Sequence, residues 1–308
     1  MDIALKSVMI NKNITQFDEK VTMRHQISTQ RHPQHGLMYL DIKTPYSHSI
    51  IFFQGAQITH FQPKDGPPLL WLSPAETFVP GKGFRGGIPI CWPWFGTHPD
   101  PNYPQHGFVR HQLWTLDEIE EQPDAVVVRM RYPSKLLLKE FWPHATELYV
   151  TFTLGKSLHM QVTTTHRGHS AIEFTQALHS YFAIPDIDTL RVQGLNQTPY
   201  IEFGQAAVQT ESDVHITQEI DRMYHDTTPL QQLQTDKGSI FIERENSHSC
   251  VLWNPWIDKA RQLTCFDDDD YQRMVCLETC NILNDKVHLA PNQSHTLSHH
   301  IFWEASTT

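Results

Sequence analysis

Residues 84–96 combine features that neither a regular helix nor a central strand can hold. The stretch reads Phe-Arg-Gly-Gly-Ile-Pro-Ile-Cys-Trp-Pro-Trp-Phe-Gly, with two prolines, three glycines and two tryptophans. Proline removes a backbone donor and glycine weakens a strand, so this density predicts an irregular segment. The large aromatic rings nevertheless favour burial. The sequence therefore predicts an ordered, packed loop that is either the wall of a ligand pocket or a buried crossover.

Most of the remaining chain reads as short strands. Residues 147–154 and 158–165 alternate polar and apolar side chains around Gly155, which predicts a hairpin. A long strand-like run covers residues 172–184, whereas only residues 256–264 and parts of 134–145 indicate short helices. Many short strands at regular spacing predict an all-β sandwich or barrel.

Nothing in the composition divides the chain into several units. We expect residues 31–308 to form one domain of large antiparallel sheets, preceded by residues 1–30 as an N-terminal arm without clear periodicity. The net charge of −10, from 34 acidic and 24 basic residues, argues against a nucleic-acid surface.

The sequence also bears on compartment and assembly. No stretch approaches the roughly 20 apolar residues that span a bilayer, and residues 1–30 lack the apolar run of a signal peptide. The five cysteines are an odd number without metal-type spacing, which favours reduced thiols. We therefore expect a cytoplasmic protein without membrane or nucleic-acid partners, and a monomer.

Three side chains have the right chemistry for proton transfer. His106 follows the irregular stretch, His179 lies within an apolar strand-like run, and Glu278 lies within another. A carboxylate in such a strand is costly to bury unless it is paired or functional. Taken singly, each residue is more typical of a structural role, because a strand histidine is more often a hydrogen-bonded core or edge residue and a strand glutamate more often faces solvent.

Two acidic stretches have alternative interpretations. Asp221 and the neighbouring Arg222 form either a surface ion pair or a contact to a polyhydroxylated ligand. Residues 267–270 are four consecutive aspartates, but they lack the alternating spacing and the glycine of a calcium loop, which favours an exposed acidic loop. The sequence contains no phosphate loop, dinucleotide fingerprint or zinc-helix motif.

Six segments, taken in order, resemble a known family. They are residues 84–96, 106–110, 177–182, 219–224, 253–256 and 275–279. In this order they are similar to the hexose-6-phosphate mutarotases, or glucose-6-phosphate 1-epimerases, of the aldose 1-epimerase superfamily. The likeness runs from about residue 37 to residue 303.

The resemblance implies a galactose-mutarotase-like β-supersandwich and the interconversion of α and β anomers of an aldohexose 6-phosphate, without metal or cofactor. His106 and His179 match the family's two active-site histidines, and Glu278 matches its catalytic carboxylate. Asp221 matches a contact to a sugar hydroxyl. The resemblance associates two arginines, Arg85 and Arg110, with the phosphorylated substrate.

A further substrate contact is expected from Gln57, in the strand that follows Gly55. In the resulting hypothesis Glu278 is the base that takes the proton of the C1 hydroxyl and His179 is the acid that protonates the ring oxygen. His106 then steadies the charge that develops during ring opening.

Three alternatives remain open from the sequence. The first is a non-enzymatic carbohydrate-binding β-sandwich that uses Trp92, Trp94 and Trp253 as stacking platforms. The second is a mutarotase of unphosphorylated aldoses such as galactose. The third is a regulatory member of the family with a degraded site, against which the intact His106, His179 and Glu278 argue.

Overall fold

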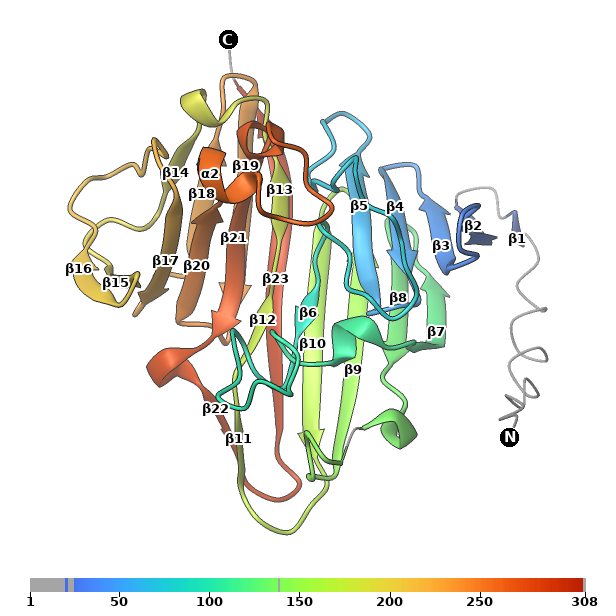
Figure 1. Cartoon of the computed structure of the whole chain (residues 1–308). Helices are drawn as coiled ribbons and strands as arrows, with labels where there is room; N and C mark the ends of the chain where they lie inside the picture. Colours follow the sequence, from blue (N-terminus) through green and yellow to red (C-terminus); the bar gives the residue numbers. More distant parts are fainter. Residues whose placement is uncertain (1–19, 22–24, 138, 307–308) are drawn as a thin grey trace.

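The structure is a computed structural model that describes residues 20–21, 25–137 and 139–306, and it consists almost entirely of antiparallel sheets (Figure 1). The N-terminal sheet has five strands in sequence order: β1 (Lys20–Val21), β2 (Gln26–Arg31), β3 (Met38–Lys43), β4 (Ser47–Phe52) and β5 (Gln57–Pro63). The predicted boundary between an arm and a domain at residue 30 falls inside β2, which pairs with β3 along its whole length. The other residues of that arm, 1–19 and 22–24, lie outside the described part of the chain.

Two larger sheets carry most of the remaining strands. The long-strand sheet has the order β14 (Arg191–Gln193), β18 (Leu230–Gln234), β19 (Gly238–Glu245), β23 (Ser294–Ala305), β10 (Leu158–His166), β9 (Thr146–Leu154), β8 (Val126–Arg131) and β7 (Thr115–Glu121). The cleft sheet has the order β16 (Gln205–Val208), β15 (Pro199–Glu202), β17 (Ile220–His225), β20 (Ser249–Asn254), β21 (Met274–Asn281), β12 (Gln176–Leu178) and β6 (Ile90–Cys91), with β13 (Tyr181–Ala183) also paired to β21. A small separate sheet joins β11 (Ile172–Phe174) to β22 (Val287–Leu289).

Helical segments are short. The α-helix α2 covers Trp256–Ala260, inside the predicted range 256–264, and the 3₁₀ turn η2 covers Ser134–Leu136, inside the range 134–145. The other 3₁₀ turns are η1 (Val109–His111), η3 (Ile187–Thr189), η4 (Asp270–Gln272) and η5 (Leu283–Asp285). Among the described helices, none is both long and apolar enough to cross a membrane.

The predicted hairpin at residues 147–165 is confirmed as β9 and β10. Both strands alternate strictly between buried and half-buried side chains, with Leu148, Val150 and Phe152 facing inward. This period of two places one face of the strand pair against the core and leaves the other to solvent.

The core extends between the long-strand sheet and the cleft sheet. One hydrophobic cluster includes side chains from both sheets and from the N-terminal sheet. Polar contacts also join the two larger sheets: Thr279 on β21 lies 3.1 Å from His299 Nδ1 on β23, and buried Arg244 on β19 donates to the carbonyl of Ser249 on β20 at 2.8 Å. The interior face of β21 is therefore covered, which is why all eight of its residues are buried.

The run at residues 172–184 is not one strand, as the sequence suggested, but three short ones: β11, β12 and β13. β12 and β13 keep one register along β21, with Leu178 opposite Thr279 and Tyr181 opposite Cys276. Two residues separate β12 from β13. The backbone N–H of His179 donates to the carbonyl of Pro89 at 3.0 Å, which continues the register of β12 with β6, whereas the N–H of Ser180 turns back to the carbonyl of Leu178 at 2.9 Å.

Candidate active site

A cleft of about 670 Å³ lies over one face of the cleft sheet. It brings together six of the seven site residues expected from the sequence: Arg85, His106, Arg110, His179, Asp221 and Glu278. They come from segments far apart in the chain, so the sheet topology is what assembles them. The seventh, Gln57, does not line this cleft.

The floor of the cleft is built from side chains that stand in rows across the paired strands. Met223 on β17 is level with Val251 on β20, and Val251 is level with Glu278 on β21. The register shared by β12 and β13 places His179 level with Glu278 on the other side. Directly opposite residues of an antiparallel pair point to the same face, so this row presents both His179 and Glu278 to the cleft.

A second row runs parallel to the first, two residues along each strand. Asp221 on β17 is level with Trp253 on β20, Trp253 is level with Cys276 on β21, and Cys276 is level with Tyr181 on β13. Asp221, Trp253 and Tyr181 all line the cleft. The period of two along a strand thus explains why Asp221 and Glu278 share one face while their immediate neighbours Arg222 and Thr279 do not.

His179 and Glu278 form a close buried pair. His179 Nε2 lies 3.4 Å from Glu278 Oε1, and only 2% of the Glu278 side chain is exposed. The ring of Tyr181 stacks beside that of His179, with centroids 4.8 Å apart and planes 12° from parallel. His179 Nδ1 and Glu278 Oε2 are both buried without a hydrogen-bond partner among the described residues, a cost that marks the pair as incomplete without a ligand.

Burial suppresses the charge on both members of this pair. It raises the pKa of Glu278 well above 4.5, with a further contribution from the negative charge of Asp221. It lowers the pKa of His179 well below 6.5, with further contributions from His106 and Arg110. Both shifts favour the uncharged forms of the pair, a protonated Glu278 and a neutral His179.

His106 is fixed as a hydrogen-bond donor. Its Nδ1 accepts the backbone N–H of Gly96 at 3.1 Å, so the proton of the neutral ring is on Nε2. Burial, followed by the charges of Arg110 and Arg85, lowers the pKa of His106 to about 3. The His106 ring lies edge-on to that of His179, with centroids 5.4 Å apart, so a neutral N–H donor stands beside the proton-transfer pair.

The backbone that presents His106 requires the next residue to be glycine. His106 and Gly107 both have positive φ, 62° and 73°, and a Cβ on Gly107 would lie 1.9 Å from the carbonyl oxygen of Trp92. Trp92 is itself fully buried, with its ring against those of Phe108 and Trp142. Trp92 therefore packs beneath the site. The close contact between the backbones of Gly107 and Trp92 fixes how far His106 lies from Trp92.

Replacing Gly107 with alanine should lower the free energy of unfolding by about 3 kcal/mol, because positive φ and a backbone clash act together. Gly81→Ala is the matched control, since Gly81 has a φ of 78° and open space where a Cβ would stand. The control should lose only about 1 kcal/mol, from the backbone conformation alone. Urea denaturation of the three proteins measures the difference; equal losses in the two variants would mean that the contact with Trp92 does not matter.

Arg85 and Arg110 supply positive charge to the cleft. Arg85 Nη2 lies 3.5 Å from the carbonyl of Thr264, and Arg110 donates to the carbonyl of Gln105 at 3.0 Å and to His111 Nε2 at 3.3 Å. Neither arginine has an ion pair with a carboxylate among the described residues. Both guanidinium groups are thus free to meet an anionic ligand.

Gln57 has a different place from the one expected. Its side chain is fully buried, and its Nε2 donates to the carbonyls of Gly86 at 2.6 Å and Phe84 at 3.4 Å. From the other side, Glu76 Oε2 accepts the backbone N–H of Arg85 at 2.6 Å. Gln57 therefore positions the backbone that carries Arg85, and we correct the expectation that it contacts the substrate.

Asp221 and Arg222 do not pair with each other. Arg222 Nε lies 3.2 Å from Glu202 Oε2 on the neighbouring strand, whereas Asp221 lines the cleft. Burial raises the pKa of Asp221, although the nearby positive charge of Lys259 opposes the shift. Of the two alternatives left open by the sequence, the geometry favours the ligand contact.

Several cleft residues were not recognised from the sequence. They include Tyr181, Lys82, Lys259, His111, Met223 and Phe203. Tyr181 could have been found, since it is two residues from His179 and a period of two puts both on one face. The lysines and Phe203 lie on a loop, on α2 and at a hairpin tip, where sequence spacing does not indicate side-chain direction.

Other motifs from the sequence have structural roles. Three aspartates of the 267–270 run are exposed, as expected, but Asp270 is buried, where its Oδ2 accepts the backbone N–H of Asp267 at 2.8 Å. All five cysteines are free. Within the described ranges, no group of three or more histidine, cysteine or acidic residues is arranged to hold a metal ion.

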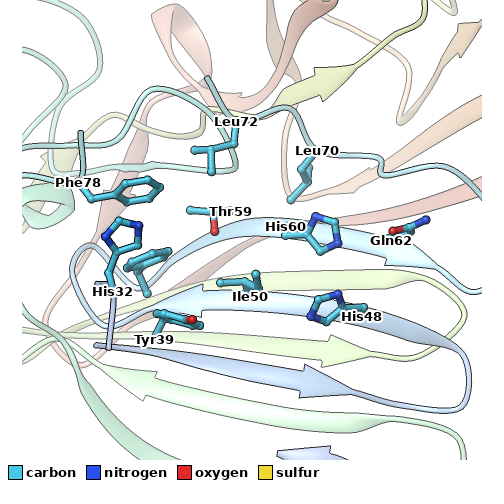
Figure 2. Close-up of a pocket in the computed structure, with 11 residues that line it drawn as sticks. His32, Tyr39, His48, Ile50, Thr59, His60, Gln62, Leu70, Leu72 and Phe78 are labelled. Atoms are coloured by element: carbon cyan, nitrogen blue, oxygen red, sulfur yellow. The ribbon is translucent and has the colours of Figure 1, made fainter. Parts of the chain in front are cut away.

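A second hollow, of about 580 Å³, lies over the N-terminal sheet and is also lined by Leu70, Leu72 and Phe78 from the loop that follows β5 (Figure 2). His48 and His60 are neighbours there, with ring centroids 4.9 Å apart. Its lining contains neither a carboxylate nor an arginine. Of these two hollows, only the first combines a histidine–carboxylate pair with arginines.

Comparison with solved structures defines the class. The fold superposes with a TM-score of 0.85 on a protein from Salmonella typhimurium described as "a putative mutarotase", with 26% identity over 94% of this chain and 96% of that chain. The expected galactose-mutarotase-like fold of large antiparallel sheets is thereby confirmed.

Residues 38–301 match the Aldose 1-epimerase family, and the chain belongs to that family. It is therefore an enzyme of the isomerase class. Among curated relatives, a protein of Cenchrus ciliaris is 33% identical over 243 residues, covering 74% of this chain and 73% of that protein. One of Escherichia coli K12 is 31% identical over 230 residues, covering 73% and 77%. Both carry the name "Putative glucose-6-phosphate 1-epimerase".

Proposed function

We propose that this enzyme interconverts the α and β anomers of an aldohexose 6-phosphate, with glucose 6-phosphate as the first substrate to test. The observation that carries the proposal is the close buried pair of His179 and Glu278 in the same cleft as two arginines that have no carboxylate partner among the described residues. The acid–base pair can open the sugar ring, and the two arginines can bind the phosphate group of the substrate. The names of the curated relatives agree with this substrate class.

Ring opening needs one proton to leave the C1 hydroxyl and another to reach the ring oxygen. With Glu278 as the base and His179 as the acid, opening moves the pair from the charged to the neutral state. The open aldehyde then rotates about its C1–C2 bond, and closure returns the protons by the reverse steps. Positioned groups of this kind typically contribute about 10²–10⁴-fold to the rate.

Burial of His179 and Glu278 suits these reaction steps. It favours the neutral forms of both side chains, and these are the forms present together with the open-chain sugar. The raised pKa of Glu278 and the lowered pKa of His179 make that state accessible instead of leaving a charge stranded in the cleft. The incoming sugar hydroxyls provide partners for the orphaned atoms Glu278 Oε2 and His179 Nδ1. Substrate binding thus determines on which group the single proton lies.

His106 and Asp221 complete the sugar site. The Nε2–H of neutral His106 donates to the C1 or ring oxygen, where negative charge develops during opening. Asp221, in the neighbouring row, accepts a hydrogen bond from a sugar hydroxyl. These two hydrogen bonds keep the rest of the sugar in place while the aldehyde group rotates about the C1–C2 bond.

The net charge of −10 is compatible with an anionic substrate because the local field at the site matters more than the total. Arg85 is suited to the 6-phosphate, since a planar guanidinium can donate two hydrogen bonds to phosphate oxygens. Arg110 adds positive charge within the same cleft. Gln57 and Glu76 hold the backbone around Arg85, so its position is set before the substrate arrives.

The pH profile of kcat should show no acid limb centred at pH 6.5. His179 becomes doubly protonated only well below 6.5, because its pKa is lowered, and Glu278 loses its proton only well above 4.5, because its pKa is raised. The state with one proton on the pair is bounded by these two values, so kcat should fall on the acid side only well below pH 6.5. The measurement must use saturating substrate, because a phosphate monoester itself titrates near pH 6. An acid limb of kcat centred at 6.5 would contradict the assignment of His179.

The first test is polarimetry on freshly dissolved α-glucose 6-phosphate, α-glucose and α-galactose. We expect the enzyme to accelerate anomerisation of the phosphate ester with a far lower KM than either free sugar. Equal kcat/KM for all three would favour a mutarotase of unphosphorylated aldoses. Binding without acceleration would favour a carbohydrate-binding module, although only Trp253 of its three proposed platforms lines the cleft.

A further inference from the structure

The hairpin of β15 and β16 ends in an unusual turn at the edge of the cleft sheet (Figure 1). Glu202 pairs with Gln205, so the loop consists of two residues, Phe203 and Gly204. Both have positive φ, 47° and 79°, as in a type I′ turn. The first position of that turn favours asparagine, aspartate or glycine, since a bulky side chain is strained there.

Phe203 is doubly costly, because its side chain is also 62% exposed. It is the most exposed large hydrophobic residue in the described part of the chain. A strained backbone and an exposed aromatic ring at one residue have no structural benefit that the fold reveals. Such an outlier points to a role in function.

The strand register places Phe203 at the cleft. Ile201 is level with Met223 and Glu202 is level with Arg222, so the next residue along, Phe203, comes level with Asp221. It extends the row of Asp221, Trp253 and Tyr181 by one position, and it lines the same cleft. The ion pair between Glu202 and Arg222, at 3.2 Å, fixes the base of the hairpin.

The cleft residues next to Phe203 in these rows form a surface that is partly polar and partly apolar. Asp221 supplies a carboxylate, whereas Met223 and Trp253 supply apolar surface. A pyranose ring presents polar hydroxyls at its edge and C–H groups on its faces, so it matches an aromatic wall beside a carboxylate.

We propose that Phe203 is a substrate-binding residue, whose ring covers the C–H face of the sugar while Asp221 binds a hydroxyl at its edge. This inference rests on the proposed function. The contact involves the sugar ring and not the phosphate, so it contributes equally to phosphorylated and free aldoses. It also acts on the bound sugar as much as on the transition state, so its loss raises KM and leaves kcat nearly unchanged.

Phe203→Asn separates this role from a structural one, because Asn-Gly is the preferred type I′ sequence. The variant should unfold at a temperature equal to or higher than that of the wild type, yet its KM for glucose 6-phosphate should rise about tenfold. Phe203→Trp, which keeps an aromatic ring, should retain a KM within about threefold of the wild type. Val208→Thr, an exposed apolar position on the same hairpin and outside the cleft lining, is the control and should leave KM unchanged.

The experiment measures KM and kcat for glucose 6-phosphate and for glucose, the thermal transition, and the sedimentation coefficient. An unchanged KM in Phe203→Asn would overturn the inference, as would an effect seen with only one of the two sugars. A changed sedimentation coefficient at unchanged KM would assign Phe203 to a protein–protein contact instead. Absence of activity in the wild type would instead overturn the proposed function, so the two failures are distinguishable.

Discussion

Glu278→Gln should lower kcat for the anomerisation of glucose 6-phosphate by about 10²–10⁴-fold, the range expected for loss of a positioned acid–base group. Glutamine keeps the shape of the side chain but can neither accept nor release the proton. KM should change little, because the sugar contacts of His106 and Asp221 remain. Single-turnover or NMR exchange kinetics can measure the residual rate against the spontaneous reaction.

Stability separates this effect from damage to the fold. Because burial raises the pKa of Glu278, ionising this carboxyl destabilises the folded state, and that loss grows as pH rises above 4.5. The glutamine variant lacks this term and should be at least as stable as the wild type at neutral pH. Glu118→Gln is the control, since Glu118 is exposed on β7, in the other large sheet, and does not line the cleft; its kcat should stay within about twofold. A Glu278→Gln enzyme with most of its kcat would show that another group is the base.

Arg85→Met should raise KM for glucose 6-phosphate by about 10–100-fold, the effect of losing hydrogen bonds to a charged phosphate. Anomerisation of free glucose should be nearly unaffected, because it has no group to meet this guanidinium. Arg85→Lys keeps the charge and loses the planar fork, so it should lie between the wild type and the methionine variant. Comparing KM for the two sugars in each protein isolates the phosphate contact.

Arg191→Met tests whether total charge explains the result. Arg191 is exposed on β14, in the other large sheet, and its loss changes the net charge by the same amount. Its KM for both sugars should match the wild type. Equal increases in KM for glucose and glucose 6-phosphate in Arg85→Met would contradict the role of Arg85 in phosphate binding.

Local patterns predicted the sheets but not their interruptions. Strict alternation in residues 147–165 was enough to predict the β9–β10 hairpin, because that signal is contained in neighbouring residues. The break between β12 and β13 could not be predicted in this way, because neither His179 nor Ser180, the two residues between these strands, is a glycine or a proline.

The sequence predicted most residues of the candidate site, but it did not predict how their side chains contact one another. His106, His179 and Glu278 have residue types suited to proton transfer, but their assignment to the site came from the resemblance to the mutarotase family. The burial of Gln57 was not predictable, because its direction depends on how residues 84–86 fold over β5. The sequence around Phe203 did not predict a site residue either. Its positive φ and its position opposite Asp221 are properties of the folded sheet.

The central claim is that the cleft catalyses anomer exchange of a hexose phosphate. Two-dimensional exchange NMR on equilibrated glucose 6-phosphate tests it directly, because the H1 signals of the two anomers exchange magnetisation only when the ring opens and closes. We predict an exchange rate that rises in proportion to wild-type enzyme concentration and that returns to the buffer value with Glu278→Gln. A rate equal to that in buffer at every concentration of the wild-type enzyme would contradict the account.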